Sequence, residues 1–303
     1  MALQSSGQIK ISEIKSELGS SSNSLRALSA AAGLSVPDAI SEFYGYSSVV
    51  ANDYYWLGDG VNDTLRFTGH GSALFNANST DDFSYSGWFR VDETTDQLQW
   101  LGSFSTSTPG GGNMIFIQYR NAQLQLRYRN NSAFHQKFVG VVANSSVTGI
   151  TSGGWTSSNR GNTNSEAFVF LTFTYDASNR NASTGIKIYW NGQEMTSVAQ
   201  SNSVSSPASY AVRSAAIGDA VSSSPNNASV FKGGIDQVSV YKKVLTQAEI
   251  TALYNSGTPI AGVDAGVTTN LLAEYRLENN GNNSSGVFPA MTNTGGSFIN
   301  VNE

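Results

Sequence analysis

The chain has 303 residues, of which 39% are hydrophobic and 13% charged, and its formal net charge is -5. Proteins that bind nucleic acid gather Lys and Arg on one surface, and no basic run is present here, so we expect no nucleic-acid partner. The sequence also lacks cysteine and any stretch near the ~20 apolar residues that span a bilayer, which excludes disulfides, thiolate metal sites and a membrane helix.

The first 46 residues predict a small helical module. Ser12 and Ser24 can each cap a short helix, and Pro37 stands where a third helix begins. Because so small a unit buries little surface by itself, we expect it to dock on another chain. The apolar residues expected to make that contact are Ile9, Ile11, Ile14, Leu18, Leu25, Leu28, Phe43 and Tyr44.

A helix-turn-helix is an alternative interpretation of this module, because residues 28–35 imitate the turn of that motif. The helix that would enter the DNA groove is Pro37–Tyr44, which carries Asp38 and Glu42 and neither Lys nor Arg. Acidic side chains repel phosphates. The module is therefore predicted not to bind DNA.

After a linker at residues 47–53, residues 54–303 predict a β-sandwich. Alternating apolar and polar residues indicate strands with one buried face, and Asn191-Gly192 is the strongest short hairpin signal in the chain. The principal expected strand regions are Trp56–Phe67, Phe83–Val91, Met114–Arg129, Ala167–Tyr175 and Ile186–Trp190.

The turn within the first of these regions holds Asp59, Asn62 and Asp63. Hard oxygen ligands at such spacing suit calcium. The alternative is that Asp and Asn side chains accept hydrogen bonds from the backbone of the turn itself. The sequence favours the second interpretation and leaves a calcium site open, and it predicts no other cofactor.

The long segment from Asn130 to Glu166 is rich in Asn, Ser, Gly and Thr. Long connections without core periodicity are often functional. Trp155, Arg160, His135 and Asn159 lie in it, and an aromatic ring beside amide and guanidinium groups is suited to stacking on a sugar and binding its hydroxyls. The alternative is that Trp155 is a core residue, because Trp is strongly buried on average.

Two further elements are expected near the C-terminus. Thr246 and Glu249 have the spacing of a capping box and predict a short amphipathic helix that ends near Gly257. Asn270–Glu278 predicts a strand that closes the sandwich, because a half-sandwich would expose its apolar residues.

The segment FKGGIDQVSVYKKVLTQAEITALYNSG at residues 231–257 resembles the closing signature of laminin-G-like, concanavalin A-like jelly rolls. The resemblance implies a mainly-β jelly-roll sandwich preceded by the small helical module. Residues 270–286 resemble the strand that normally begins this domain, which implies a permuted C-terminal strand or a truncated second repeat. The region that resembles a calcium cluster of the pentraxin relatives keeps Asp219 alone.

Residues 1–46, with SSGQIKISEIKSELG and the closing Phe43-Tyr44-Gly45, resemble an N-terminal module of predicted structural proteins of tailed phages. The resemblance implies a bacteriophage virion protein, either a head decoration or a tail-fibre component. It would be present in many copies or as a homo-oligomer, bound to other virion proteins. The absence of a basic and apolar signal region at the start agrees with assembly in a virion.

An adhesin that recognises host surface glycan is the alternative function, and an enzyme that cuts such glycans is a third. Concanavalin A-like glucanases place carboxylates on alternate positions of one strand, as in E-x-D-x-x-E. That pattern is absent from this sequence. We therefore expect a binding protein and not an enzyme.

Overall fold

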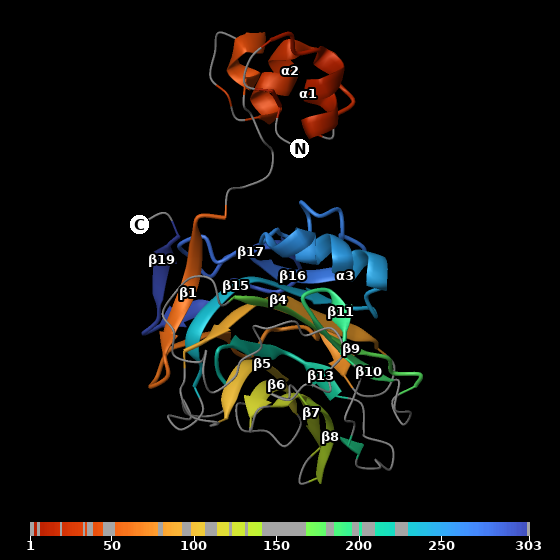
Figure 1. Cartoon of the computed structure of the whole chain (residues 1–303), viewed down its shortest axis with the longest axis vertical. Helices are drawn as coiled ribbons and strands as arrows, with labels where there is room; N and C mark the ends of the chain where they lie inside the picture. The colour runs from red at the N-terminus through yellow and green to blue at the C-terminus, as the bar shows by residue number, and fades with distance from the viewer. Residues whose placement is uncertain are drawn as a thin grey trace. The chain divides into compact units, whose positions relative to one another are not determined.

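The computed structural model describes residues 3–4, 7–18, 20–32, 34, 39–44, 52–77, 81–92, 98–106, 114–120, 123–130, 133–140, 168–179, 185–195, 200–201, 210–221 and 230–301. The chain divides into two compact units, Met1–Asn52 and Asp53–Glu303. The division falls inside the predicted linker. Figure 1 labels many of the helices and strands of the two units.

The N-terminal unit contains the helices α1 (Ile11–Leu18) and α2 (Leu25–Ala31) and the 3₁₀ turn η1 (Ile40–Phe43). Ser24 caps α2 as predicted, since its side chain accepts a hydrogen bond from the Ala27 N–H. The prediction for Ser12 is wrong. Ser12 lies inside α1, where Glu13 satisfies an exposed backbone group instead, by accepting from Lys10 N at 2.8 Å.

The second unit is a sandwich of antiparallel sheets, which confirms the predicted fold class. In the described residues, sheet A follows the order β11-β10-β9-β4-β15-β1-β19, and off this path β16 pairs with β15 and β17 pairs with β16. Its strands are β1 (Tyr54–Asp59), β4 (Phe83–Val91), β9 (Val169–Tyr175), β10 (Ile186–Trp190), β11 (Gln193–Glu194), β15 (Lys232–Tyr241), β16 (Leu271–Tyr275), β17 (Asn283–Gly286) and β19 (Ser297–Asn300).

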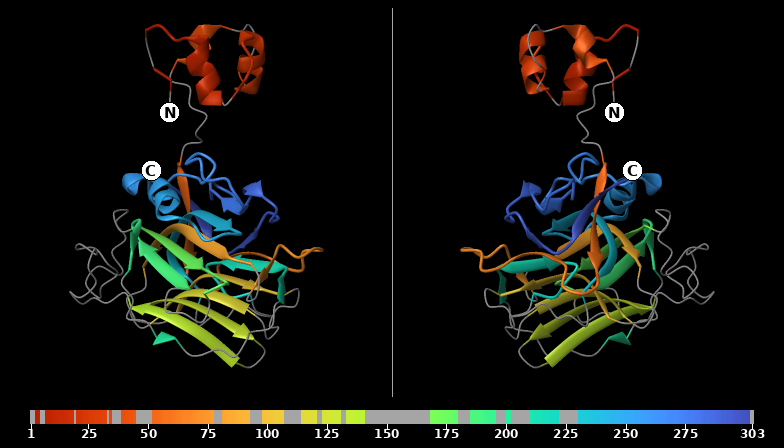
Figure 2. Two further views of the ribbon diagram at one scale, coloured as in Figure 1. Left: turned by 90° about the vertical axis from the view of Figure 1, so that its right-hand side faces the viewer. Right: turned by 90° about the vertical axis from the view of Figure 1, so that its left-hand side faces the viewer.

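Sheet B follows the order β12-β8-β7-β6-β5-β14-β2-β18, and a small two-stranded sheet pairs β3 with β13. Figure 2 shows β6, β7 and β8 as a layer separate from the strands of sheet A. The strands outside sheet A are β2 (Thr64–Phe67), β3 (Phe75–Ala77), β5 (Gln99–Ser105), β6 (Met114–Arg120), β7 (Gln123–Asn130), β8 (Ala133–Gly140), β12 (Gln200–Ser201), β13 (Tyr210–Val212), β14 (Ser214–Ile217) and β18 (Thr292–Thr294).

The main core lies between the two sheets, because successive side chains of a strand point to opposite faces. On β4, Tyr85 and Phe89 pack into this core, while Trp88 and Arg90 point to the other face. Each sheet therefore has an inner face in the core and an outer face. The two outer faces differ in what lies on them.

Helix α3 (Gln247–Tyr254) covers part of the outer face of sheet A, as Figure 1 shows. The predicted capping box is present: Thr246 N donates to Glu249 Oε2 at 2.9 Å, and Glu249 N donates to Thr246 Oγ1 at 3.3 Å. The helix buries Ile250 and Leu253 in a second apolar cluster with Trp88 of β4 and neighbouring side chains.

The C-terminal segment contributes strands to both sheets. The strand predicted within residues 270–278 is β16, which pairs with β15 in the register Val238↔Tyr275. Farther along the chain, β18 pairs with β2 of sheet B and β19 pairs with β1 of sheet A. The first half of β15 pairs with β1 and the second half with β16.

Candidate functional site

The predicted glycan-binding residues are not brought together by the described part of the chain. Trp155, Asn159 and Arg160 lie outside the described residues. His135 belongs to β8, where it is paired with Tyr128 of β7. The expectation of a connection without regular structure from Asn130 onward is wrong for residues 133–140, which form a full strand of sheet B.

The predicted calcium turn is built from hydrogen bonds to its own backbone. Asp59 N donates to Asp63 Oδ2 at 2.8 Å, and Val61 N donates to Asp59 Oδ1 at 2.7 Å. Burial raises the pKa of the Asp63 carboxyl above its ordinary value. One oxygen of each carboxylate is thus occupied, and calcium at Asp59, Asn62 and Asp63 stays a prediction. In the described ranges, no three Asp, Glu, His or Cys side chains form a metal-binding group.

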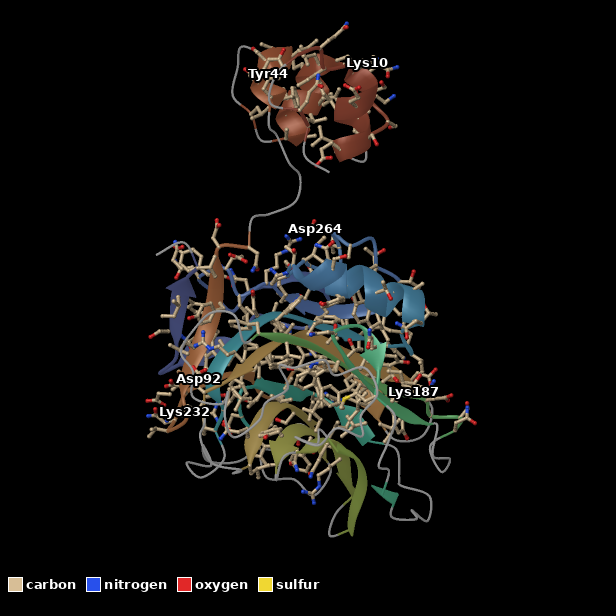
Figure 3. The ribbon with its side chains drawn as sticks, in the orientation of Figure 1. Lys10, Tyr44, Asp92, Lys187, Lys232 and Asp264 are labelled. Carbon is tan, nitrogen blue, oxygen red and sulfur yellow. The ribbon has the colours of Figure 1, made fainter. Side chains whose placement is uncertain are left out.

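The residues predicted to anchor the N-terminal unit form a core inside that unit. Ile9, Ile14, Leu28 and Phe43 are at most 5% exposed, and Ile11, Leu18 and Leu25 pack against them. Their burial is accounted for without another chain. Tyr44, labelled in Figure 3, is different, since it is 42% exposed and its hydroxyl donates to Gly7 O.

The outer face of sheet A has a buried cation whose partners are present. Arg90 is 3% exposed, and its Nε and Nη2 each donate to Asp92 at 2.8 Å. The guanidinium carbon lies 5.1 Å from the centre of the Tyr55 ring and 5.3 Å from that of Phe168. Asp92 is fixed in turn, because its backbone N–H donates to Lys232 O at 2.9 Å; both residues are labelled in Figure 3.

The outer face of sheet B is a patch of polar and aromatic side chains, which we call the polar face. One row across the sheet follows from the strand registers Arg127↔Phe116, Phe116↔Ser103, Ser103↔Ala216 and Ala216↔Arg66. The adjacent row contains Trp100, Gln118 and Gln125. Besides these residues, the polar face includes Thr64 of β2 and Asp219, which follows β14.

Several buried polar atoms of this face have unused hydrogen-bonding capacity. Gln118 Nε2 donates to Gln125 Oε1, but Gln118 Oε1 has no partner in the described residues. The same is true there of Trp100 Nε1, Thr64 Oγ1 and Asp219 Oδ2. These residues are at most 7% exposed. Buried polar groups normally have partners, so this set stands out.

The two aromatic rings of the polar face pack together. The ring centres of Trp100 and Phe116 are 4.8 Å apart, with 40° between the ring planes. Ala216, Ala220 and Val221 complete this apolar cluster. Because Trp100 and Gln118 are direct partners across β5 and β6, an unused indole donor and an unused amide acceptor occupy opposed positions.

Comparison with known proteins decides the family. A profile described as the concanavalin A-like lectin/glucanases superfamily matches residues 59–251, which is more than half of the chain. The chain belongs to this superfamily. A search of curated proteins found no match.

Two of the solved structures that are similar to this chain have low sequence identity to it. A heptameric SAP-like pentraxin from Limulus polyphemus is 12% identical, with a TM-score of 0.50 over 82% of this chain and 95% of that one. The CBM40 of the Ruminococcus gnavus IT-sialidase is 14% identical, with a TM-score of 0.40 over 63% of this chain and 96% of that one. At 12% identity the likeness to the pentraxin bears on the fold alone.

Sequence reasoning missed the polar face. The signal available was the alternation in QWLGSFS and MIFIQYR, which places Trp100 and Gln118 on the face opposite to Leu101 and Ile117. The pairing of β5 with β6 across the sheet could not be derived from that alternation alone.

No helix in the described residues is long and apolar enough to cross a membrane.

Proposed function

We propose that the sandwich is a lectin-like module that binds carbohydrate, without catalysis, on the polar face of sheet B. The observation that supports this most is an indole donor, an amide carbonyl and a carboxylate oxygen on one face, each without a partner in the part of the chain that the structure describes. Leaving such groups buried without partners costs about 1–3 kcal/mol each. A ligand that satisfies them recovers this free energy.

Carbohydrate fits because a hydroxyl group both donates and accepts. One sugar hydroxyl can accept from Trp100 Nε1–H and donate to Gln118 Oε1, which are opposed across the strands. The packed rings of Trp100 and Phe116 offer an apolar surface beside these groups. Apolar surface with a few placed polar groups is the usual composition of a small-ligand site.

The polar face meets solvent at its two ends. Arg66 and Arg127 are partly exposed, whereas Phe116, Ser103 and Ala216 between them are buried. A ligand is therefore expected to approach the polar face beside these arginines.

The experiment is glycan binding by the full chain and by two matched variants. Trp100→Phe removes the indole donor of the polar face, and Trp88→Phe removes an equally buried indole, also without a partner in the described residues, on the helix-covered face of sheet A. We expect Trp100→Phe to lose at least about tenfold in affinity, the loss of one hydrogen bond of this kind, with Trp88→Phe unchanged.

Equal binding by the two variants, at similar thermal stability, would contradict the proposed site. Absence of binding by the parent to any member of a printed panel of neutral, uronic-acid-containing and sialylated glycans would contradict the proposed function.

We also propose that the chain works as a bacteriophage virion protein, with many copies bound to other virion proteins through residues 1–46 and the sandwich presenting host-glycan binding. The support is the resemblance of that segment to tailed-phage modules, together with its separate compact core. Deleting residues 1–46 should leave a folded sandwich that no longer joins particles of the phage that encodes it. Normal copy number of the truncated chain in particles would contradict this role.

A further inference from the structure

Asp219 is directed to the polar face by a turn that only glycine can form at the preceding position. Gly218 has a φ of +76°, and a Cβ there would lie 2.8 Å from the Trp56 ring. Asp219 is then held on both sides, because Ala220 N donates to its Oδ1 at 2.6 Å and Ser103 Oγ donates to its carbonyl oxygen at 3.0 Å. The carboxyl group therefore has a fixed orientation.

The second carboxyl oxygen has no partner. Asp219 is 0% exposed, and its Oδ2 accepts no hydrogen bond from the described residues. An ionised carboxylate in this condition is costly to bury. Burial raises the pKa of the Asp219 carboxyl to about 6, while the Ala220 N–H and the charge of Arg66 pull it down.

The charged group that faces Asp219 comes from β2, and it is Arg66. Ser103 of β5 and Ala216 of β14 carry no charge, and Arg127 of β7 lies beyond Phe116 in the row. Arg66 lowers the pKa of Asp219 but does not occupy Oδ2. This oxygen is the strongest unused acceptor on the polar face, because a charged acceptor makes stronger hydrogen bonds than a neutral one.

We propose that Asp219 determines ligand specificity on the polar face, by accepting a hydrogen bond at Oδ2 from a ligand hydroxyl when the carboxyl is ionised. The proposal rests on the proposed carbohydrate-binding function. Its chemical consequence is that the ligand must offer a donor to Oδ2, so a deoxy or O-methylated analogue at that hydroxyl is rejected. Its second consequence is that proton binding to Asp219 competes with ligand binding.

The experiment measures dissociation constants for the tightest-binding glycan of the panel, with the full chain, in buffers containing EDTA across about pH 5 to 8, which brackets the titration of this carboxyl. Parent affinity should be constant above about pH 6 and fall by about tenfold per pH unit below it, because the ionised fraction falls in that proportion. In Asp219→Asn the side-chain carbonyl oxygen can still accept from Ala220 N. The NH2 group then takes the place of Oδ2 and donates where the carboxylate accepted. We expect at least about tenfold weaker binding than the parent at high pH and little dependence on pH.

Glu278→Gln is the matched control. Glu278 is also a carboxyl whose pKa is raised by burial, but it accepts from Asp53 N at 2.9 Å and Tyr54 N at 3.1 Å at the start of β1 in sheet A. This variant should keep the pH profile of the parent. A loss of the profile in Glu278→Gln would show that a general effect of carboxyl titration is at work, and would overturn the proposal.

Three other outcomes also overturn it. Asp219→Asn could bind with the affinity and pH profile of the parent. This result would show that Asp219 does not determine specificity, and it would leave the proposed carbohydrate-binding function intact. Glycan binding could require added Ca²⁺ and fail in EDTA, which would make Asp219 a cation ligand. The parent could bind no glycan at any pH, in which case the proposed function fails and this proposal fails with it.

Discussion

Both outer faces of the sandwich carry buried polar side chains, and the two faces differ in what covers them: α3 and the segment before it lie on sheet A, and residues 219–221 lie beside Ser103 on sheet B. On sheet A, Ser84 Oγ donates to Lys243 O at 2.7 Å and accepts from Leu245 N at 3.0 Å, and Arg90 pairs with Asp92 at the end of β4. On sheet B, Ser103 Oγ likewise donates to Asp219 O and accepts from Val221 N. On sheet B, Asp219 Oδ2 and Gln118 Oε1 have no partner in the described residues.

Both outer faces contain buried polar atoms that have no hydrogen-bond partner in the described residues. On sheet A, within the described ranges, they include Trp88 Nε1, Thr172 Oγ1 and Tyr241 Oη. On the polar face they include a carboxylate oxygen of Asp219 and the amide carbonyl of Gln118, which are strong acceptors. The proposed ligand site on sheet B and the packing of α3 on sheet A are tested by changing one face at a time.

The largest expected effect comes from removing the segment that adds strands to both sheets. Deleting residues 270–303 removes β16 to β19 and several buried side chains, each of which contributes ~1.5–3 kcal/mol. Their sum is comparable to the whole stability of a domain. The residues concerned are Leu272, Ala273, Tyr275, Leu277, Phe288 and Met291.

Thermal unfolding followed by circular dichroism should show no cooperative transition for that deletion. The control is deletion of residues 1–46, which lie in a separate compact unit and should leave the transition near that of the parent. A deletion of residues 270–303 that melted like the parent would contradict the assignment of these strands to the sandwich.

A smaller effect is expected from the helix-covered face. Ile250 of α3 is 0% exposed, so Ile250→Ala should lower the free energy of unfolding by ~2–5 kcal/mol. Thr251→Ala, on the exposed side of the same helix, should change it by less than about 1 kcal/mol. Urea unfolding gives both values. Glycan affinity should be unchanged in both variants. A loss of glycan binding in Ile250→Ala would contradict the proposal that the ligand binds on the polar face and not on the helix-covered face.

The smallest expected effect is a change in the free energy of unfolding whose size depends on pH. Because the pKa of folded Asp219 is raised from 3.8 to about 6, the stabilisation that protonated Asp219 provides is present at low pH and is lost as pH rises through about 6. Asp219→Asn does not titrate. Its stability relative to the parent should therefore rise by ~1–3 kcal/mol between about pH 4 and pH 7.

Urea unfolding of the parent and Asp219→Asn across that range measures the difference directly. If the difference in free energy of unfolding between the parent and Asp219→Asn did not change with pH, Asp219 would be solvated. The main contrast between the polar face and the sheet A face would then be lost.

Local patterns predicted the elements that are fixed by neighbouring residues. The spacing of Thr246 and Glu249 predicted α3, whose capping box is formed. Asn191-Gly192 predicted the β10–β11 hairpin, and both residues have the positive φ that its turn needs, 48° and 78°. The β6–β7 hairpin followed in the same way from alternation.

Features that depend on distant segments were beyond the sequence. Ser12 is a separate case, because its local pattern predicted a cap while the neighbouring Glu13 accepts from Lys10 N at the start of α1. Asp219 carries no local sign of its environment, because its hydrogen bond to Ser103 joins residues 116 positions apart. The polar face needed the register of β7, β6, β5, β14 and β2, which no short pattern contains.

Hydrogen exchange of the full chain with and without the tightest-binding glycan is the most direct test of the polar face as the ligand site. We expect the ligand to slow amide exchange in β5, β6 and residues 218–221, and to leave α3 and the turn at residues 59–63 unchanged. Protection confined to α3 or to that turn, with β5 and β6 unaffected, would contradict the account.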